Sequence, residues 1–204
     1  MTTVNPIDVK PARRSFWREL PILVIVAVLV AVLVRTFVVQ TFWIPTESME
    51  PTLLVNDRVL VNKLLYDVRD PRRGEIVVFV APQTWRTDPN EKDFIKRVIG
   101  VAGDHLICCD ARGRVTVNGR ALDEPYVKGE FHGSPFDVVV PPGRLFVMGD
   151  NRAISGDSTK HLDDNHGTIR ADSVVGRAFL IFWPFDRVRI LSVPATFAQV
   201  PAPR

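Results

Sequence analysis

Residues 44–53, Ile-Pro-Thr-Glu-Ser-Met-Glu-Pro-Thr-Leu, place Ser48 just after a long apolar segment and just before a series of short β-type runs. The stretch therefore marks where a membrane segment ends and a folded domain begins. A serine hydroxyl is a weak nucleophile at neutral pH and needs a base beside it. Lys96, 48 residues downstream in Asp-Phe-Ile-Lys-Arg-Val-Ile-Gly, has apolar neighbours that can desolvate its ammonium group. Together these features indicate proteolysis at a membrane face.

The apolar segment covers residues 20–34, which carry no charge, and spans a bilayer if it continues to about residue 39, since a span takes about 20 residues. Lys10, Arg13, Arg14 and Arg18 precede it, which predicts a cytoplasmic N-terminus by the positive-inside rule. We expect a basic cytoplasmic tail over 1–15, a single transmembrane anchor over 16–39 and an extracytoplasmic domain over 40–204. The expected location is the cell membrane.

A cleavable signal peptide is the competing interpretation, because its apolar core runs about 7–15 residues. The segment 20–34 fits that length, but no Ala-x-Ala type of cleavage site follows Val34. A retained anchor is therefore favoured.

Size and charge narrow the class of protein. A chain of 204 residues suits one domain plus a tether, and its formal net charge is only +3. No long basic run appears, so the sequence predicts no nucleic-acid partner.

The region after the anchor is predicted to be mainly β and antiparallel, because short apolar runs alternate with Gly, Pro, Asn and Asp. Asn118-Gly119 is a strong signal for a two-residue hairpin turn. Two loops, 82–92 and 151–168, are longer than a compact β domain needs, which is typical of functional or disordered segments. The predicted strands are residues 37–44, 58–64, 75–80, 94–101, 105–109, 114–117, 136–140, 145–148, 174–182 and 188–191.

Both members of the serine–lysine pair have ordinary alternatives. Side chains alternate across a strand, so Lys96 and Arg97 point to opposite faces and one cation lies among apolar groups. A buried lysine can lose its proton, whereas an arginine keeps its charge. The alternatives are an edge lysine with its head in water and a serine that caps a turn between two prolines.

The adjacent Cys108 and Cys109 permit a disulfide outside the cytoplasm. Bonding neighbours closes a strained eight-membered ring, so we expect two half-buried thiols instead. Their spacing also predicts no metal site. His161, Asp163, Asp164 and His166 match no defined metal spacing either, and we expect a solvated loop there.

Four segments resemble, in order, the conserved boxes of type I signal peptidases, the bacterial serine–lysine leader peptidases. They are residues 44–53, 57–64, 73–79 with 93–104, and 149–158. The resemblance covers nearly the whole chain and is closest to the compact single-anchor branch. It implies a mainly β fold with a smaller second β subdomain, an insertion at about 105–140.

The resemblance also assigns roles. Ser48 matches the nucleophile and Lys96 the general base, while the Thr46 hydroxyl and the Ser48 N–H match the oxyanion hole. Ser155 matches a serine that hydrogen-bonds the lysine ammonium, and Asp157, Asp150 and Arg152 match the polar network around it. Phe42, Ile44, Met49, Leu53, Phe94 and Ile95 match the lining of shallow pockets for the substrate side chains at −1 and −3. The sequence departs from the family at Ala153, where a second acidic residue is frequent, and at Glu47, where glycine is common.

The resemblance implies a membrane-bound serine endopeptidase that removes signal peptides from exported pre-proteins after small residues at −3 and −1, through an acyl-enzyme and without a cofactor. Its expected partners are pre-protein signal peptides, the lipid bilayer and, as a further candidate, the secretion translocon. Two alternatives are a catalytically silent membrane-tethered β scaffold and a self-cleaving repressor-type Ser/Lys peptidase. The anchor argues against the second, and a lysine at position 96 argues against a eukaryotic-type relative, which has histidine there.

Overall fold

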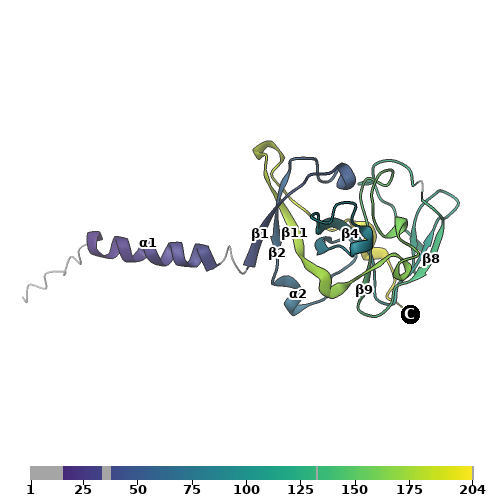
Figure 1. Cartoon of the computed structure of the whole chain (residues 1–204), viewed down its shortest axis with the longest axis horizontal. Helices are drawn as coiled ribbons and strands as arrows, with labels where there is room; N and C mark the ends of the chain where they lie inside the picture. The colour runs from purple at the N-terminus through teal and green to yellow at the C-terminus, as the bar shows by residue number, and fades with distance from the viewer. Residues whose placement is uncertain (1–15, 34–37, 132, 204) are drawn as a thin grey trace, which may run out of the picture. The chain divides into compact units, whose positions relative to one another are not determined.

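The computed structural model describes residues 16–33, 38–131 and 133–203 (Figure 1). The chain divides into two compact units, Met1–Phe37 and Val38–Arg204. The expected tail over 1–15 and residues 34–37 of the expected anchor lie outside the described residues.

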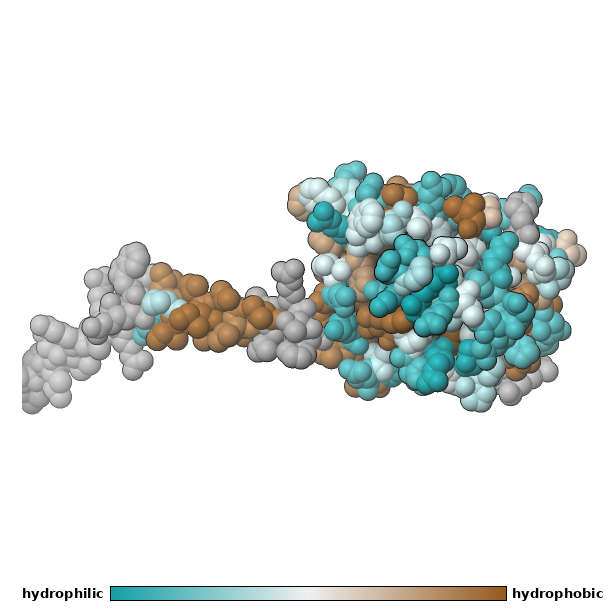
Figure 2. All heavy atoms as spheres, viewed as in Figure 1, coloured by the Kyte–Doolittle hydropathy of each residue, from teal (hydrophilic) through white to brown (hydrophobic). Residues whose placement is uncertain are grey.

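The first unit contains one helix, α1 (Phe16–Leu33). Figure 2 shows α1 as largely apolar, and Ile22, Leu23 and Val24 are each more than half exposed. Across the described parts of the chain, no helix combines the length and the apolar character that crossing a membrane requires.

The second unit is built on a large antiparallel sheet in the order β1-β2-β11-β3-β4-β9-β10, with β12 paired to β11. This sheet carries both candidate catalytic segments, because the Ser48 loop follows β1 and Lys96 lies in β4. The strands are β1 (Val39–Trp43), β2 (Arg58–Asn62), β3 (Ile76–Val80), β4 (Asp93–Val101), β9 (Arg144–Met148), β10 (Thr168–Arg170), β11 (Val174–Trp183) and β12 (Arg189–Ile190).

A smaller antiparallel sheet, in the order β7-β6-β5-β8, lies within the same unit. Its strands are β5 (His105–Cys108), β6 (Thr116–Val117), β7 (Arg120–Ala121) and β8 (Phe136–Val139). Asn118 and Gly119 join β6 to β7 with φ values of 53° and 79°. Positive φ at both positions is what a type I′ turn requires, so the predicted hairpin is confirmed.

Helical structure in the second unit is limited to short segments. They are α2 (Leu65–Val68) and the 3₁₀ turns η2 (Glu47–Met49), η3 (Gln83–Trp85), η4 (Ser158–Lys160), η5 (Asn165–Gly167), η6 (Ala171–Ser173), η7 (Phe185–Arg187) and η8 (Ala195–Gln199).

Three apolar clusters form the core and cover both faces of β4. Val98 belongs to one cluster, Ile99 to another and the half-buried Ile95 to the third. Lys96 and Arg97 are therefore both buried, whereas we predicted burial for only one of them. The prediction assumed that one face of β4 is exposed to solvent, but residues 96–100 are all buried.

The mainly β, antiparallel fold class with a small second sheet is confirmed. Each of the ten predicted runs contains a strand, with ends that differ by a few residues. Strands β7 and β10 lie outside the predicted runs, since strands of two and three residues are too short to show an alternating pattern.

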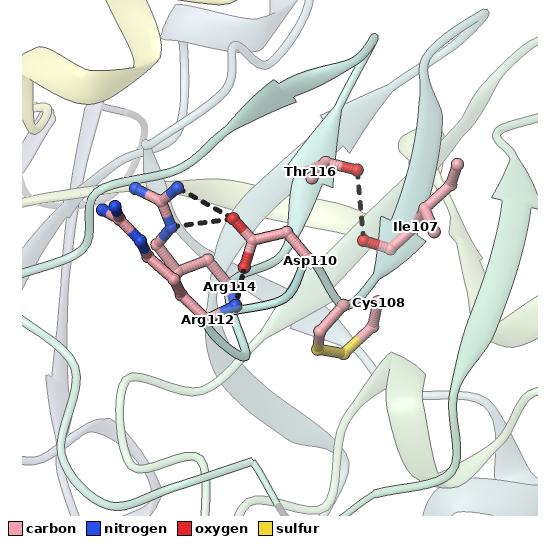
Figure 3. The surroundings of a disulfide bond; sticks show 7 residues. Ile107, Cys108, Asp110, Arg112, Arg114 and Thr116 are labelled. Atoms are coloured by element: carbon pink, nitrogen blue, oxygen red, sulfur yellow. Dashed lines mark hydrogen bonds and ion pairs between the residues drawn. A yellow bond between two sulfur atoms is a disulfide. The ribbon is translucent and has the colours of Figure 1, made fainter.

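The expectation of two free thiols is wrong, because Cys108 and Cys109 form a disulfide (Figure 3). Strand β5 ends at Cys108, so Cys109 is not held to the alternation of side chains that separates neighbours within a strand. Cys108 is buried and Cys109 is exposed. The bond adjoins a turn in which Asp110 accepts two side-chain hydrogen bonds from Arg114.

Candidate active site

Ser48 lies in η2, in the loop that follows β1. The loop is fixed at both ends, since the Ile44 N–H donates to the Asp57 carbonyl at 3.0 Å and the Leu53 N–H to the Met49 carbonyl at 2.9 Å. Only 8% of Ser48 is exposed. The hydroxyl is therefore held in one place at the edge of the core.

Lys96 reaches this hydroxyl from β4, where it pairs with Val77 of β3. Its ammonium nitrogen Nζ donates to Ser48 Oγ at 2.8 Å, and Lys96 is 4% exposed. Burial lowers the pKa of Lys96 to about 8 because the ammonium loses its hydration, an effect that the charges of Asp157, Glu91 and Asp150 partly offset. With a pKa of about 8, roughly a tenth of the amine is neutral at pH 7, far more than for a lysine in water.

Thr46 stands beside the pair on its exposed side, with its Oγ1 3.2 Å from Ser48 Oγ. A hydroxyl at this position can turn its proton toward a group that sits over Ser48. The structure thus places the predicted oxyanion donor next to the predicted nucleophile.

Asp150 anchors the segment 149–158 to β4, the strand that contains Lys96. Its carboxylate accepts from Arg97 Nε at 2.8 Å and from Arg97 Nη2 at 2.6 Å, and it also accepts from the Thr52 hydroxyl. The Arg97–Asp150 pair is fully buried. Because Arg97 follows Lys96 and Thr52 lies in the loop of Ser48, the pair ties together the segments that carry both candidate catalytic groups.

Asp157 organises the same segment internally rather than contacting Lys96. Its carboxylate accepts from the Gly149 N–H at 2.8 Å and from the N–H and hydroxyl of Thr159 at 3.0 and 2.8 Å. Its negative charge still acts on the Lys96 ammonium and raises the pKa of that group against the larger effect of burial.

Ser155 differs from the expectation. Its hydroxyl is buried and has no hydrogen-bond partner among the described residues, so the expected bond to Lys96 is absent. The hydroxyl lies instead against Gly149, where an added Cβ would come within 2.3 Å of Ser155 Oγ and 2.4 Å of the Ser48 carbonyl oxygen. Gly149 therefore lets the segments of Ser48 and Ser155 approach each other closely.

Asn151 was not among the predicted site residues, although it lies inside the segment 149–158. Its N–H donates to the Ser48 carbonyl at 3.1 Å, and its side-chain amide donates to the Glu47 carbonyl at 3.2 Å. Both bonds hold the turn that carries Ser48. The one signal in the sequence that could have identified Asn151 is its side-chain amide, which lies among the acidic and hydroxyl residues of this segment.

Arg152 links the site to a segment that follows β7. Its Nε donates to the Gly149 carbonyl at 3.1 Å, and its Nη2 donates to Glu124 at 2.6 Å. In the same segment, the Lys128 N–H donates to the Asp150 carbonyl at 2.8 Å, and Lys128 Nζ pairs with Glu50 at 2.6 Å. No motif or pattern in the sequence predicts that residues 124–128 border the site.

The six predicted pocket residues do not have equal access to solvent. Ile44, Met49 and Leu53 are fully buried in one core cluster, and Phe42 and Ile95 are half-buried against the same cluster. Phe94 packs in a different cluster, edge-on to Phe79.

The second long loop folds over the core rather than extending into solvent. The His161 ring stacks on Trp85 with centroids 4.6 Å apart, and Asp164 accepts a hydrogen bond from Thr84. In the described segments no group of three His, Cys, Asp or Glu residues is placed to hold a metal ion.

Comparison with known proteins gives a consistent family. Residues 17–183 match the family model described as signal peptidase, peptidase S26. The signal peptidase I of Mycobacterium tuberculosis (strain H37Rv) is 37% identical over 225 residues, covering 87% of this chain and 76% of its own. The probable signal peptidase I-2 of Synechocystis sp. is 41% identical over 176 residues, covering 86% and 78%. A solved structure of a signal peptidase I from Enterococcus faecalis gives a TM-score of 0.41 at 28% identity, covering 53% of this chain and 97% of that chain.

Proposed function

We propose that this chain, which belongs to the signal peptidase family, peptidase S26, and is a signal peptidase hydrolase, cuts its substrate with Ser48 as nucleophile and Lys96 as general base. The observation that carries the proposal is the 2.8 Å contact between a buried amine and a buried hydroxyl. Lys96 is the only ionisable side chain that hydrogen-bonds to Ser48 in the described residues.

Catalysis begins with Lys96 in its neutral form. The amine accepts the Ser48 proton while Ser48 Oγ attacks the carbonyl carbon of the scissile bond, and the resulting ammonium then gives that proton to the leaving amine. This leaves an acyl-enzyme on Ser48. Lys96 next takes a proton from a water molecule, whose oxygen attacks the ester, and returns it to Ser48 as the signal peptide departs with a free carboxylate.

The tetrahedral oxyanion needs donors that are already in place. The Thr46 hydroxyl lies 3.2 Å from Ser48 Oγ, and together with the Ser48 N–H it forms the proposed oxyanion hole. A single such donor is worth about 10²–10³ in rate. Asp150, Asp157 and Arg152 form the proposed supporting network through their hydrogen bonds, and Ser155 supports the same segment by packing against Gly149.

Selectivity for small residues at −1 and −3 follows from the apolar surroundings of Ser48. Ile44, Met49 and Leu53 are buried in one apolar cluster, and the half-buried Phe42 and Ile95 pack against it. Phe94, on the same strand as Lys96, completes the proposed lining. These residues are proposed to form shallow pockets for the −1 and −3 side chains.

The proposed location is the cell membrane, with residues 16–39 as a single anchor and the catalytic domain outside. The charge-free residues 20–34 and the basic residues before them support this topology. Trp43 and Trp183, both exposed, pair across strands with the same Arg58, and Trp183 packs against Phe185 at 4.6 Å. Indole rings favour the membrane interface, so this patch is suited to contact lipid near the site. The translocon is a further proposed partner.

The test is cleavage of a lipid-presented pre-protein with an Ala-x-Ala site by the full chain. We expect the wild type to cut after the second alanine, and Ser48→Ala and Lys96→Ala to be folded and inactive. Ser134→Ala and Lys160→Ala change the same residue types at exposed positions and should behave as the wild type. Replacing the −1 alanine by leucine should abolish cleavage. Normal activity in Lys96→Ala would show that another base operates, and an inert wild type would favour the tethered scaffold.

A further inference from the structure

A pocket of about 760 Å³ lies away from the Ser48–Lys96 pair, between the turn after α2, strand β11 and the C-terminal segment. We call it the arginine pocket, because its lining includes Arg69, Arg72, Arg73 and Arg177. The proposed catalysis uses none of these four residues.

The arginine pocket has more positive than negative charge. Arg73 is paired with Asp104, to which its Nε donates at 2.6 Å. Arg69 forms a bidentate ion pair with Glu75. Arg177 lies 3.5 Å from the already paired Glu75, and the Arg72 side chain has no ion pair within the described part of the chain. Four guanidinium groups thus face two carboxylates.

Glu75, which lies beside both Arg69 and Arg177, is held in its ionised form. Burial raises the pKa of Glu75, but hydrogen bonds from Arg69 and from the Arg72 N–H outweigh that effect and lower it below its usual value. The excess of two positive charges therefore remains for an external anion.

One wall of the pocket is apolar. Val193 and Phe197 pack so closely on the turn that a Cβ added to Gly74 would lie 2.7 and 2.6 Å from their side chains. Val193 keeps part of its surface exposed. A cationic rim beside an apolar wall suits an anion that carries hydrocarbon, more than a fully hydrated one.

The pocket also lies near the point where the chain enters the domain. Val39, the first residue of β1, pairs with Asn62 of β2, and Asn62 pairs with Arg177 of β11. Two strand spacings separate Val39 from Arg177, which is about 10 Å. Nearby α2 exposes Val68 to 83% and is preceded by the exposed Leu64. If residues 16–39 are the anchor, as proposed above, the chain leaves the membrane at this end of the domain.

We propose that the arginine pocket binds the phosphate of an anionic phospholipid, with Arg72 and Arg177 on the phosphate oxygens and Val193 and Phe197 against the glycerol and the first acyl carbons. The site holds the domain against an anionic leaflet. This placement rests on the proposed anchor, but binding itself does not require the proposed catalytic pair.

The test measures binding by the full chain in a neutral detergent. Added short-chain phosphatidylglycerol should raise the melting temperature, because a ligand that binds only the native state stabilises it. The double variant Arg72→Gln/Arg177→Gln should bind at least about 10-fold more weakly, since both guanidinium groups proposed to hold the phosphate are lost. Arg112→Gln/Arg120→Gln, which removes the same charge from exposed positions near the small sheet, should bind as the wild type.

Three further ligands decide the source of the anion. Phosphatidylcholine of the same chain length, inorganic phosphate and a phosphoserine peptide should each give less than a tenth of the affinity for phosphatidylglycerol. Equal binding of any of the three, or unchanged binding by Arg72→Gln/Arg177→Gln, would overturn the proposal. Cleavage of a soluble peptide substrate is measured in parallel, and all variants should match the wild type there. If the wild type does not cleave the peptide, the proposed catalytic function is wrong. The measured lipid binding would still support the arginine pocket as a lipid site.

Discussion

Lys96 Nζ and Ser48 Oγ lie 2.8 Å apart, although 48 residues separate them in the sequence. The serine comes from a turn after β1 and the lysine from β4, and these strands are not neighbours in the sheet. The contact is therefore a product of the whole sheet, and it places an amine deprived of water against the group that it is proposed to deprotonate.

The dependence of activity on pH should report the titration of Lys96. Burial lowers the pKa of this group to about 8, and only its neutral form accepts a proton. We expect kcat/KM to rise about tenfold per pH unit below pH 8 and to level off above it. The measurement is a pH profile with a soluble peptide substrate. A profile that is flat between pH 6 and 9 would exclude Lys96 as the base.

The same burial should cost stability, with a defined dependence on pH. A lysine whose pKa falls from 10.5 to about 8 on folding binds its proton more weakly in the folded state, so the penalty is complete below pH 8 and vanishes above about 10.5. At pH 7 it amounts to about 3 kcal/mol. Lys96→Met should therefore raise the free energy of unfolding at pH 7, and this gain should shrink as the pH approaches 10.5.

Urea unfolding of the full chain, followed by tryptophan fluorescence, measures this difference. Lys160→Met, which changes an exposed lysine, serves as the control and should show no such dependence on pH. A constant difference between Lys96→Met and the wild type from pH 7 to 10.5 would mean that the lysine titrates normally.

Gly149→Ala should damage the site through a steric clash. The new methyl group would lie 2.3 Å from Ser155 Oγ and 2.4 Å from the Ser48 carbonyl oxygen, so the nucleophile turn must shift. We expect kcat to fall at least about 100-fold, since small displacements of a reacting group can cost that much. Gly156→Ala is the matched control, because a Cβ there meets nothing within 4 Å. Equal activity of the two variants would contradict the close approach.

Much of the fold was predictable because the relevant signals are local. Apolar runs between turn residues marked the strands, and Asn118-Gly119 marked a hairpin because both positions need a positive φ. Ser48 and Lys96 were identifiable because each lies within a short motif.

The remaining contacts depend on segments that the sequence does not connect. Asn151 contacts the turn of Ser48 from about a hundred residues away, and Lys128 approaches Glu50 from 78 residues away. The burial of Arg97 was missed because it requires Asp150 from another segment to neutralise it. The disulfide was missed because it depends on where β5 ends.

Asn151→Ala should slow the chemical step without abolishing it. The substitution removes the side-chain bond to the Glu47 carbonyl and keeps the backbone bond to the Ser48 carbonyl. One lost hydrogen bond is worth about 1 kcal/mol, so we expect kcat to fall about 5- to 10-fold with KM nearly unchanged. Asn165→Ala, at an exposed position, should leave both constants unaltered. A rise in KM alone would assign Asn151 to substrate binding instead.

Asp150→Asn should destabilise the domain far more than a surface change of the same kind. The variant leaves the Arg97 guanidinium, which is 2% exposed, without the carboxylate that accepts two of its hydrogen bonds. Removing one partner of a buried pair costs about 3–5 kcal/mol, because the other charge stays buried. Asp172→Asn removes an exposed partner of Arg170 and should have no measurable effect on the free energy of unfolding. The double variant Arg97→Met/Asp150→Leu should recover part of the loss, since no charge is then left uncompensated. If Asp150→Asn and Asp172→Asn unfold at the same urea concentration, Arg97 must reach water in solution, and the pair cannot be what aligns Lys96 with Ser48.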